Sequence, residues 1–295
     1  MDTERNLRRY QDAAEWPAEE ALAAMLDNQF SAFAAVRVAV PSIAAAAMVA
    51  AERLGAGGRL IYCGAGASGR LAVQDGVELY PTFGWPTERL AFLIAGGEAA
   101  LMRSVEGAED DAGAGAREAG ALRLCGSDVV VAVAASGTTR FTCAVQQVAA
   151  AAGALTVAMA NNPDTKLLDG AEHRVLLHTG PEFLAGSTRM TAGTAQKIAL
   201  NLFSTRLMTE LGRVYQGHMV DMVPSSAKLV ARARGMVAAI TGVSAVRAEV
   251  ALKQAGGSVK VAVLMLDGLD RSEAEGRLEA ACGRLDRVRD AGAGG

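Results

Sequence analysis

The amino-acid sequence predicts an α/β fold: a doubly wound, mainly parallel five-stranded sheet flanked by helices, followed by a small C-terminal helical subdomain. Between residues 60 and 178, short apolar and β-branched runs alternate with loops that contain glycine, serine or asparagine and with helical stretches. The runs are nearly all apolar, which is typical of parallel strands that are covered on both faces. Beyond about Asp221 the strand pattern fades and helical spacing continues.

Residues 1–55 are predicted to form a helical arm, because Leu22, Leu26, Phe30 and Phe33 recur at three- and four-residue intervals. The apolar stretch of residues 36–51 is interrupted by charged, proline and serine residues, so we expect no membrane-spanning helix. The first 20 residues mix acids and bases and lack the basic-then-apolar order of a signal peptide. The sequence therefore predicts a cytoplasmic protein.

The domain of residues 56–221 is predicted to hold five strands, at residues 60–63, 90–94, 129–133, 155–159 and 175–178. A long buried helix follows at residues 186–212, with Gly212 as its C-terminal cap. In the C-terminal subdomain of residues 222–295, four helices are predicted, each with a serine where an N-cap belongs. Their ranges are Ser225–Ile240, Ser244–Gln254, Ser258–Leu266 and Ser272–Cys282.

Composition argues against several classes of protein. The formal net charge is −3, which provides no field for binding a polyanion, so we expect no nucleic-acid partner. The four cysteines are far apart in the chain and form no C-x-x-C pair. The three histidines are not spaced to place two ligands on one helix face. We therefore expect neither a metal site nor a disulfide framework.

Three loops rich in hydroxyl groups each precede a helix. Residues 64–70 read Gly-Ala-Gly-Ala-Ser-Gly-Arg after the first strand, residues 135–139 read Ala-Ser-Gly-Thr-Thr after the third, and residues 186–189 read Gly-Ser-Thr-Arg. Each loop alone could be ordinary helix capping. In a doubly wound sheet, however, loops at the carboxyl ends of the strands converge on one crevice, where helix starts can bind a phosphate. We therefore predict one phosphate site, and the candidate ligands are Gly66, Ser68, Gly69, Ser136, Gly137, Thr138, Thr139, Ser187, Thr188 and Arg189.

The first of these loops also spells G-x-G-x-x-G, which allows two other interpretations. A dinucleotide-binding fold would place an acid at the end of the second strand, but Glu88 precedes that strand. The glycines could also serve only to make a tight turn. A P-loop lysine is missing from all three loops, so ATP is not the expected ligand, and we predict no cofactor.

Two acids are candidates for proton transfer, although each alone is more often a solvated surface group. Glu78 has Val77, Leu79 and Tyr80 as neighbours, and Glu109 lies in the acidic segment of residues 105–111. An acid with apolar surroundings has its ionised form disfavoured, which suits proton donation at neutral pH.

At these positions the sequence resembles the N-acetylmuramic acid 6-phosphate etherases, which are members of the sugar isomerase (SIS) domain superfamily. The matching blocks run from about Pro41 onward and include GRLIYCGAGASGRL, PTFG, LIAGGEAAL, VEGAEDD, DVVVAVAASG, GPE, GSTRMTAGTAQK and MVDM, in that order. The helical C-terminal part also resembles the small helical module of this family. The resemblance implies an SIS domain over residues 56–221.

The resemblance further implies cleavage of the lactyl ether of N-acetylmuramic acid 6-phosphate, which gives N-acetylglucosamine 6-phosphate and D-lactate during peptidoglycan recycling. The two glutamates of the family fall on Glu78, the acid that protonates departing lactate and later activates water, and on Glu109, the base at C2. Arg189 and Lys197 are candidates for stabilising enolate charge. The domains of this family pair, so a homodimer is expected, and the apolar helical arm is consistent with it.

The chain departs from the usual family residues at Ala67, Leu79, Tyr80, Thr138, Arg140 and Thr191, while the phosphate-binding hydroxyls and Glu78 remain. Two other functions stay open on the same scaffold. One is an aldose–ketose isomerase, which would share proton abstraction at C2 and break no ether. The other is a non-catalytic sugar-phosphate sensor similar to the glucokinase regulatory protein. The retained pair of glutamates favours an enzyme.

Overall fold

The computed structural model describes residues 1–55 and 57–292, which form two compact units. One unit holds residues 1–76 and 88–204, and the other holds residues 77–87 together with the chain from Thr205 onward. This division differs from the predicted one, because the N-terminal arm packs into the sheet unit and residues 77–87 join the C-terminal unit. Residue 56 and residues 293–295, which the predicted division included, lie outside the described residues.

The first unit contains a five-stranded parallel sheet in the order β2-β1-β3-β4-β5, which confirms the predicted fold class. The strands are β1 (Leu60–Gly64), β2 (Leu90–Ile94), β3 (Val129–Ala134), β4 (Leu155–Ala160) and β5 (His173–Leu176). Four strands lie where predicted, but β5 begins two residues before the predicted range. It is an edge strand whose first residues pair with β4 through the backbone while the side chain of Arg174 is exposed.

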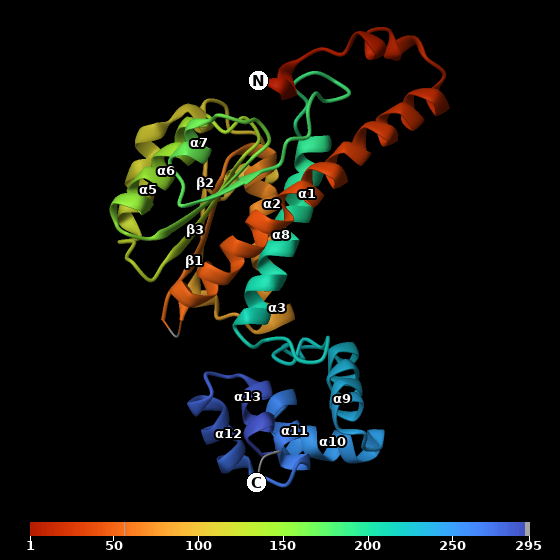
Figure 1. Cartoon of the computed structure of the whole chain (residues 1–295), viewed down its shortest axis with the longest axis vertical. Coiled ribbons are helices and arrows are strands. Elements are labelled where there is room, and N and C mark those ends of the chain that lie inside the picture. The colour runs from red at the N-terminus through yellow and green to blue at the C-terminus, as the bar shows by residue number, and fades with distance from the viewer. Residues whose placement is uncertain (56, 293–295) are drawn as a thin grey trace. The chain divides into compact units, whose positions relative to one another are not determined.

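Helices cover both faces of the sheet (Figure 1). On one face lie α5 (Ala112–Ala121), α6 (Arg140–Ala151) and α7 (Lys166–Asp169), and on the other lie α1 (Ala18–Leu54), α2 (Gly66–Val77) and α8 (Thr191–Glu210). Shorter elements in the first unit are η1 (Asp2–Glu4), η2 (Arg8–Tyr10), η3 (Ala13–Glu15), α4 (Ala99–Met102) and η5 (Ala108–Asp110), and η4 (Thr87–Arg89) lies at the boundary between the units in the sequence. The strands of the sheet centre, β3 and β4, are buried along their whole length, as nearly all-apolar runs predict.

The helix α1 runs without interruption through Pro41, within the range of the predicted helical arm. Ala32, Val36, Ala39 and Ile43 form its buried face, and the small residues among them allow close packing on the sheet. Among residues 1–55 and 57–292, α1 is the one helix that is long and apolar enough to cross a membrane. The bent pair of helices at residues 227–241 and 245–254 meets the same criterion if it is treated as one span.

The helix α8 begins at Thr191, five residues later than predicted. Glu182 explains the difference, because its carboxylate, which is 0% exposed, accepts hydrogen bonds from the backbone N–H groups of Thr191 (2.9 Å) and Ala192 (2.8 Å). This acid caps the helix and satisfies two of its unpaired amides. Residues 186–190 therefore remain a loop.

The second unit contains α3 (Leu79–Phe83), α9 (Ala227–Thr241), α10 (Ala245–Gln254), α11 (Val259–Leu266), α12 (Arg271–Ala280) and α13 (Leu285–Gly292). Ser244 and Ser258 cap α10 and α11 as predicted. Ser226 caps α9 in place of the predicted Ser225, and Asp270 caps α12 in place of the predicted Ser272. The last helix, α13, was not predicted. An apolar core shared by α9–α13 holds these short helices together.

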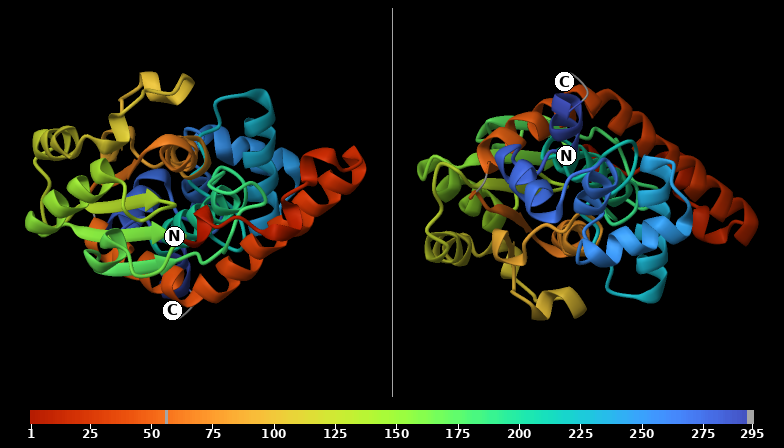
Figure 2. Two further views of the ribbon diagram at one scale, coloured as in Figure 1. Left: turned by 90° about the horizontal axis from the view of Figure 1, so that it is seen from above. Right: turned by 90° about the horizontal axis from the view of Figure 1, so that it is seen from below.

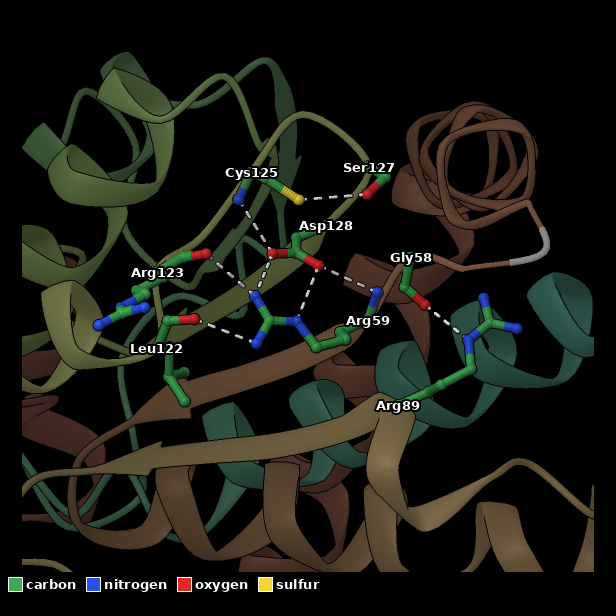
Figure 3. A network of polar contacts seen from close by, with 8 residues as sticks. All are labelled: Gly58, Arg59, Arg89, Leu122, Arg123, Cys125, Ser127 and Asp128. Atoms are coloured by element: carbon green, nitrogen blue, oxygen red, sulfur yellow. Dashed lines mark hydrogen bonds and ion pairs between the residues drawn. The ribbon is translucent and has the colours of Figure 1, made fainter.

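An ion pair joins the amino ends of β1 and β3 (Figure 3). The guanidinium of Arg59 contacts Asp128 through Nη2 at 2.6 Å and through Nε at 3.1 Å, and it also donates to the carbonyl groups of Leu122 and Arg123. The side chain of Asp128 is 1% exposed and that of Arg59 is 29% exposed. Burial opposes ionisation of Asp128, but hydrogen bonds from Arg59 and from backbone amides outweigh it, so the pKa of Asp128 lies below its usual value.

Candidate active site

The three hydroxyl-rich loops lie around one pocket of about 360 Å³ at the carboxyl edge of the sheet. All of its lining residues belong to the first compact unit. Five of them carry hydroxyl groups: Ser68, Ser136, Thr138, Thr139 and Thr188. The others are Glu4, Ala65, Gly66, Ala67, Glu109, Asp110, Ala134, Ala135 and Gly186. The loops thus converge as parallel-sheet topology predicts.

The first loop joins β1 directly to α2. Gly66 has φ of +53°, which a residue with a side chain rarely adopts, and it lines the pocket. Gly69 does not line the pocket. A Cβ on Gly69 would come within 3.0 Å of the backbone of Gly64, so this glycine lets the helix start lie against the strand end. Of the predicted ligands in this loop, Gly66 and Ser68 reach the pocket and Gly69 serves packing.

The second loop joins β3 to α6. The hydroxyl of Ser136 accepts a hydrogen bond from the backbone N–H of Thr138 at 3.2 Å and lies 3.3 Å from the hydroxyl of Thr139. Gly137 has φ of +68°, and a Cβ there would meet the side chain of Thr165 at 2.3 Å. Gly137 therefore permits the turn without lining the pocket, while Ser136, Thr138 and Thr139 line it.

The third loop precedes α8 and contributes Gly186 and Thr188 to the pocket. Ser187 and Arg189, which were also predicted ligands, are not among the lining residues, and Arg189 is exposed. The late start of α8 explains this, because residues 186–190 form turns in which only some side chains face inward.

An N-terminal segment, residues 2–4, forms part of the pocket wall and was not predicted. Asn162, which is 2% exposed, accepts from the backbone N–H of Asp2 at 2.7 Å and donates to the Thr3 hydroxyl at 3.0 Å. The carbonyl of Thr3 accepts from the N–H of Gly186 at 2.9 Å, so the segment is tied to the loop before α8 (Figure 2, left). This attachment places Glu4 among the lining residues.

A second pocket of about 170 Å³ shares Ala65, Gly66 and Glu109 with the first. Its wall also includes Arg70 from α2, Ala95 and Ala100 around the end of β2, and residues 104–108. Arg70 is held in place by two hydrogen bonds, from Nε to the carbonyl of Ala100 at 2.9 Å and from Nη2 to that of Arg103 at 3.2 Å.

The charges around the first pocket are acidic. Its wall contains Glu4, Glu109 and Asp110, and within the described residues no lysine or arginine lines it. Lys197 does not reach it either, because its ammonium donates to Asn201. Asn201 in turn donates to the buried Asp75 at 2.7 Å. The predicted role of Arg189 and Lys197 beside the pocket in this chain is therefore not supported.

Asp75 is the centre of a buried network that fixes α2 against β1 and α8. It accepts from the Tyr62 hydroxyl at 2.7 Å and from the Ser204 hydroxyl at 3.0 Å, in addition to Asn201. Burial, and then the charge of Asp75, raise the pKa of Tyr62 well above its usual value, so its hydroxyl stays protonated as a donor. The network holds the helix whose first turn lines both pockets.

Glu78 belongs to the second compact unit, at the start of α3. The prediction that apolar groups surround it is wrong for this single chain, because Val77 is 50% exposed, Tyr80 is 46% exposed and Glu78 itself is exposed. Only Leu79 of the neighbouring apolar residues turns inward, as the short helix α3 buries one side.

Comparisons with known proteins match this chain to SIS domains in sequence and to a phosphosugar isomerase in fold. Residues 42–150 match the family described as the glucokinase regulatory protein N-terminal SIS domain, and residues 114–206 match the SIS domain. A phosphosugar isomerase structure from Bacteroides fragilis has a TM-score of 0.50 and 18% identity over 68% of this chain and 95% of its own, which supports the fold alone.

Two curated relatives are much more similar in sequence. The N-acetylmuramic acid 6-phosphate etherase of Deinococcus radiodurans is 50% identical over 280 residues, which cover 95% of this chain and 92% of the relative. The etherase of Serratia proteamaculans is 46% identical over 252 residues, which cover 85% of each chain. The family that the sequence motifs predicted is thus confirmed: the chain belongs to the N-acetylmuramic acid 6-phosphate etherase family of enzymes.

Proposed function

We propose that this protein cleaves the D-lactyl ether of N-acetylmuramic acid 6-phosphate and produces N-acetylglucosamine 6-phosphate and D-lactate. The observation that carries the proposal is one pocket that combines five hydroxyl side chains from three loops with Glu109. Such a site can bind a phosphorylated sugar and place a carboxylate beside its carbon chain. The function agrees with that of the curated relatives.

The hydroxyl-lined part of the pocket is proposed to bind the 6-phosphate. Ser68 lies in the first turn of α2, and Thr138 and Thr139 directly precede α6. The N-terminal ends of helices carry unpaired amides and a partial positive charge, which together stabilise an anion. These donors would take the place of a lysine or arginine, which the part of the chain that the structure describes does not supply to the lining. Hydroxyls can add further hydrogen bonds to the phosphate oxygens.

The chemistry starts from the open-chain form of the sugar, in which the C1 aldehyde acidifies the C2 proton. Glu109 is proposed to remove that proton, and Glu78 to donate a proton to the C3 ether oxygen as lactate leaves and a C2–C3 double bond forms. Water then adds at C3 with Glu78 as base, and a proton returns to C2. The net reaction consumes one water and releases one lactate. Backbone amides of the loops can stabilise the enolate charge.

The role of Glu78 rests on its match to the family motif. In one chain its surroundings are open to solvent, and a second subunit is proposed to complete them. The stripe of Leu22, Leu26, Phe30 and Phe33 on α1 offers a surface for such a partner, because these side chains are 59–64% exposed. A contiguous apolar stripe of this kind marks an interaction surface. We propose a cytoplasmic homodimer.

The homodimer predicts that sedimentation of the unaltered protein gives twice the mass of one chain. Placing a charge in the stripe, as in Phe30→Glu, should shift the protein to single chains because a carboxylate would be desolvated in the interface. Val246→Glu is a matched control, since Val246 is 73% exposed on the second unit. A single-chain mass for the unaltered protein would contradict the homodimer.

The central test is incubation of the purified protein with N-acetylmuramic acid 6-phosphate and measurement of D-lactate. Release is expected, and Ser68→Ala or Ser136→Ala should raise KM roughly 10- to 100-fold, since a hydrogen bond to a charged group contributes about 1.5–3 kcal/mol. Ser127→Ala is the control, because Ser127 is exposed and contacts Cys125 near the opposite edge of the sheet.

Two other results would redirect the assignment. Conversion between aldose and ketose phosphates without lactate would favour an isomerase. Binding of sugar phosphates without any turnover would favour a sensor, a role compatible with the match of residues 42–150 to the glucokinase regulatory protein SIS domain.

A further inference from the structure

We propose that the second pocket is the leaving-group subsite, in which the guanidinium of Arg70 binds the carboxylate of the lactyl group. This inference rests on the proposed function and adds to it a specificity-determining residue. The two pockets are continuous, because Ala65, Gly66 and Glu109 line both. A substrate with its phosphate in the first pocket could therefore extend into the second.

The position of Glu109 indicates which group of the substrate lies in each pocket. As the proposed base it must lie beside C2, and the lactyl ether is attached to the adjacent carbon, C3. Glu109 borders both pockets, so the reacting carbons would lie at their junction. The phosphate on C6 and the lactyl group on C3 then occupy opposite sides of Glu109. The second pocket, about 170 Å³ in volume, is the smaller of the two, as the smaller group requires.

Arg70 has the chemistry and the fixed position that a carboxylate needs. It is the one cationic side chain that lines either pocket within the described residues. Its contacts with the carbonyls of Ala100 and Arg103 use Nε and Nη2, and in the described part of the chain Nη1 has no hydrogen-bond partner. A guanidinium held in this way is oriented before the ligand arrives and offers planar donors to carboxylate oxygens.

The two pockets differ in the anion they suit. Phosphate presents three terminal oxygens, and the first pocket supplies five hydroxyls and the starts of two helices. The second pocket offers one cation, Arg70, and one hydroxyl side chain, Ser104, and the carboxylates of Glu106 and Glu109 also line it. One guanidinium and one hydroxyl can satisfy the two oxygens of a carboxylate, but they supply fewer donors than the three terminal oxygens of a phosphate can accept.

The test compares a ligand that carries the lactyl group with one that lacks it. For Arg70→Met, kcat/KM for N-acetylmuramic acid 6-phosphate is expected to fall at least about tenfold, because a charge-assisted hydrogen bond is lost. The inhibition constant of N-acetylglucosamine 6-phosphate should change less than about twofold. Arg117→Met is the matched control, since its side chain is 73% exposed and lines neither pocket.

Arg70→Met also removes the hydrogen bonds from Arg70 to the carbonyls of Ala100 and Arg103, so a second variant is needed that leaves Arg70 unchanged. Ser104 is exposed and lines the second pocket, so Ser104→Trp should fill the subsite and leave the fold and Arg70 in place. It should lower kcat/KM and spare inhibition by N-acetylglucosamine 6-phosphate. Equal weakening of both ligands, or no change in either, would overturn the subsite. Lack of lactate from the unaltered protein would instead overturn the proposed function itself.

Discussion

Replacing Glu78 by glutamine is expected to lower kcat for D-lactate release by about 10²- to 10⁴-fold, the usual contribution of general acid–base catalysis. The amide has nearly the shape of the acid but cannot donate a proton to the ether oxygen. The fold should tolerate the change, because Glu78 is exposed and its side chain makes no capping hydrogen bond at the start of α3. The measurements are lactate release and the melting temperature.

Isotope exchange can separate the roles of the two glutamates. In heavy water, Glu78→Gln should still exchange the C2 hydrogen of the substrate, since Glu109 can remove it, whereas Glu109→Gln should lose both exchange and lactate release. Glu88→Gln is the control, because Glu88 is an exposed acid in η4. Lactate release by Glu78→Gln at the unaltered rate would refute the assignment of Glu78 as the acid.

The largest expected effect on stability comes from Arg59→Met. This change leaves the buried carboxylate of Asp128 without its cation, with backbone amides as its remaining donors. Loss of one partner of a fully buried pair costs about 3–5 kcal/mol, and we expect about 2–3 kcal/mol because Arg59 is 29% exposed. The free energy of unfolding from urea titration measures the loss.

The loss of unfolding free energy in Arg59→Met should become smaller as the pH falls. The folded-state pKa of Asp128 lies below its usual value, so the stabilisation is fully present above about pH 4 and is lost as pH falls through the folded-state pKa. The difference between Arg59→Met and the unaltered protein should therefore shrink in acid.

The control for this change is Arg117→Met, which removes an exposed partner of Asp111 at 3.9 Å, where the side chains are 73% and 53% exposed. It should change the free energy of unfolding by less than about 1 kcal/mol. A pH-independent loss in Arg59→Met would show that packing of the arginine stem, and not the ion pair, carries the stability.

The sequence predicted the sheet well because each strand is a short apolar run ended by glycine, serine or asparagine. It misplaced the edge strand β5, where His173 and Arg174 pair through backbone atoms that side-chain hydrophobicity does not report. It also started α8 too early, because the capping acid Glu182 lies nine residues before the first amide it binds. Long-range caps of this kind leave no local pattern.

For the site, loop composition predicted which segments meet but not which side chains face inward. Gly69 and Gly137 serve close packing, and Lys197 is turned toward Asn201. Glu4 was missed because its placement depends on Asn162, a residue 158 positions away in the chain. The apolar residues beside Glu78 in the sequence also did not bury it, because Val77 at the end of α2 and Tyr80 on α3 are exposed.

The attachment of residues 2–4 has a practical consequence for handling the protein. Thr3 is fully buried, and the next residue carries a carboxylate into the wall of the pocket. We expect a purification tag or fluorescent fusion ahead of Met1 to weaken the hydrogen bonds of Asp2 and Thr3 and to displace Glu4 from the pocket wall. Such additions are better placed at the C-terminal end, because no described residue of α13 lines either pocket.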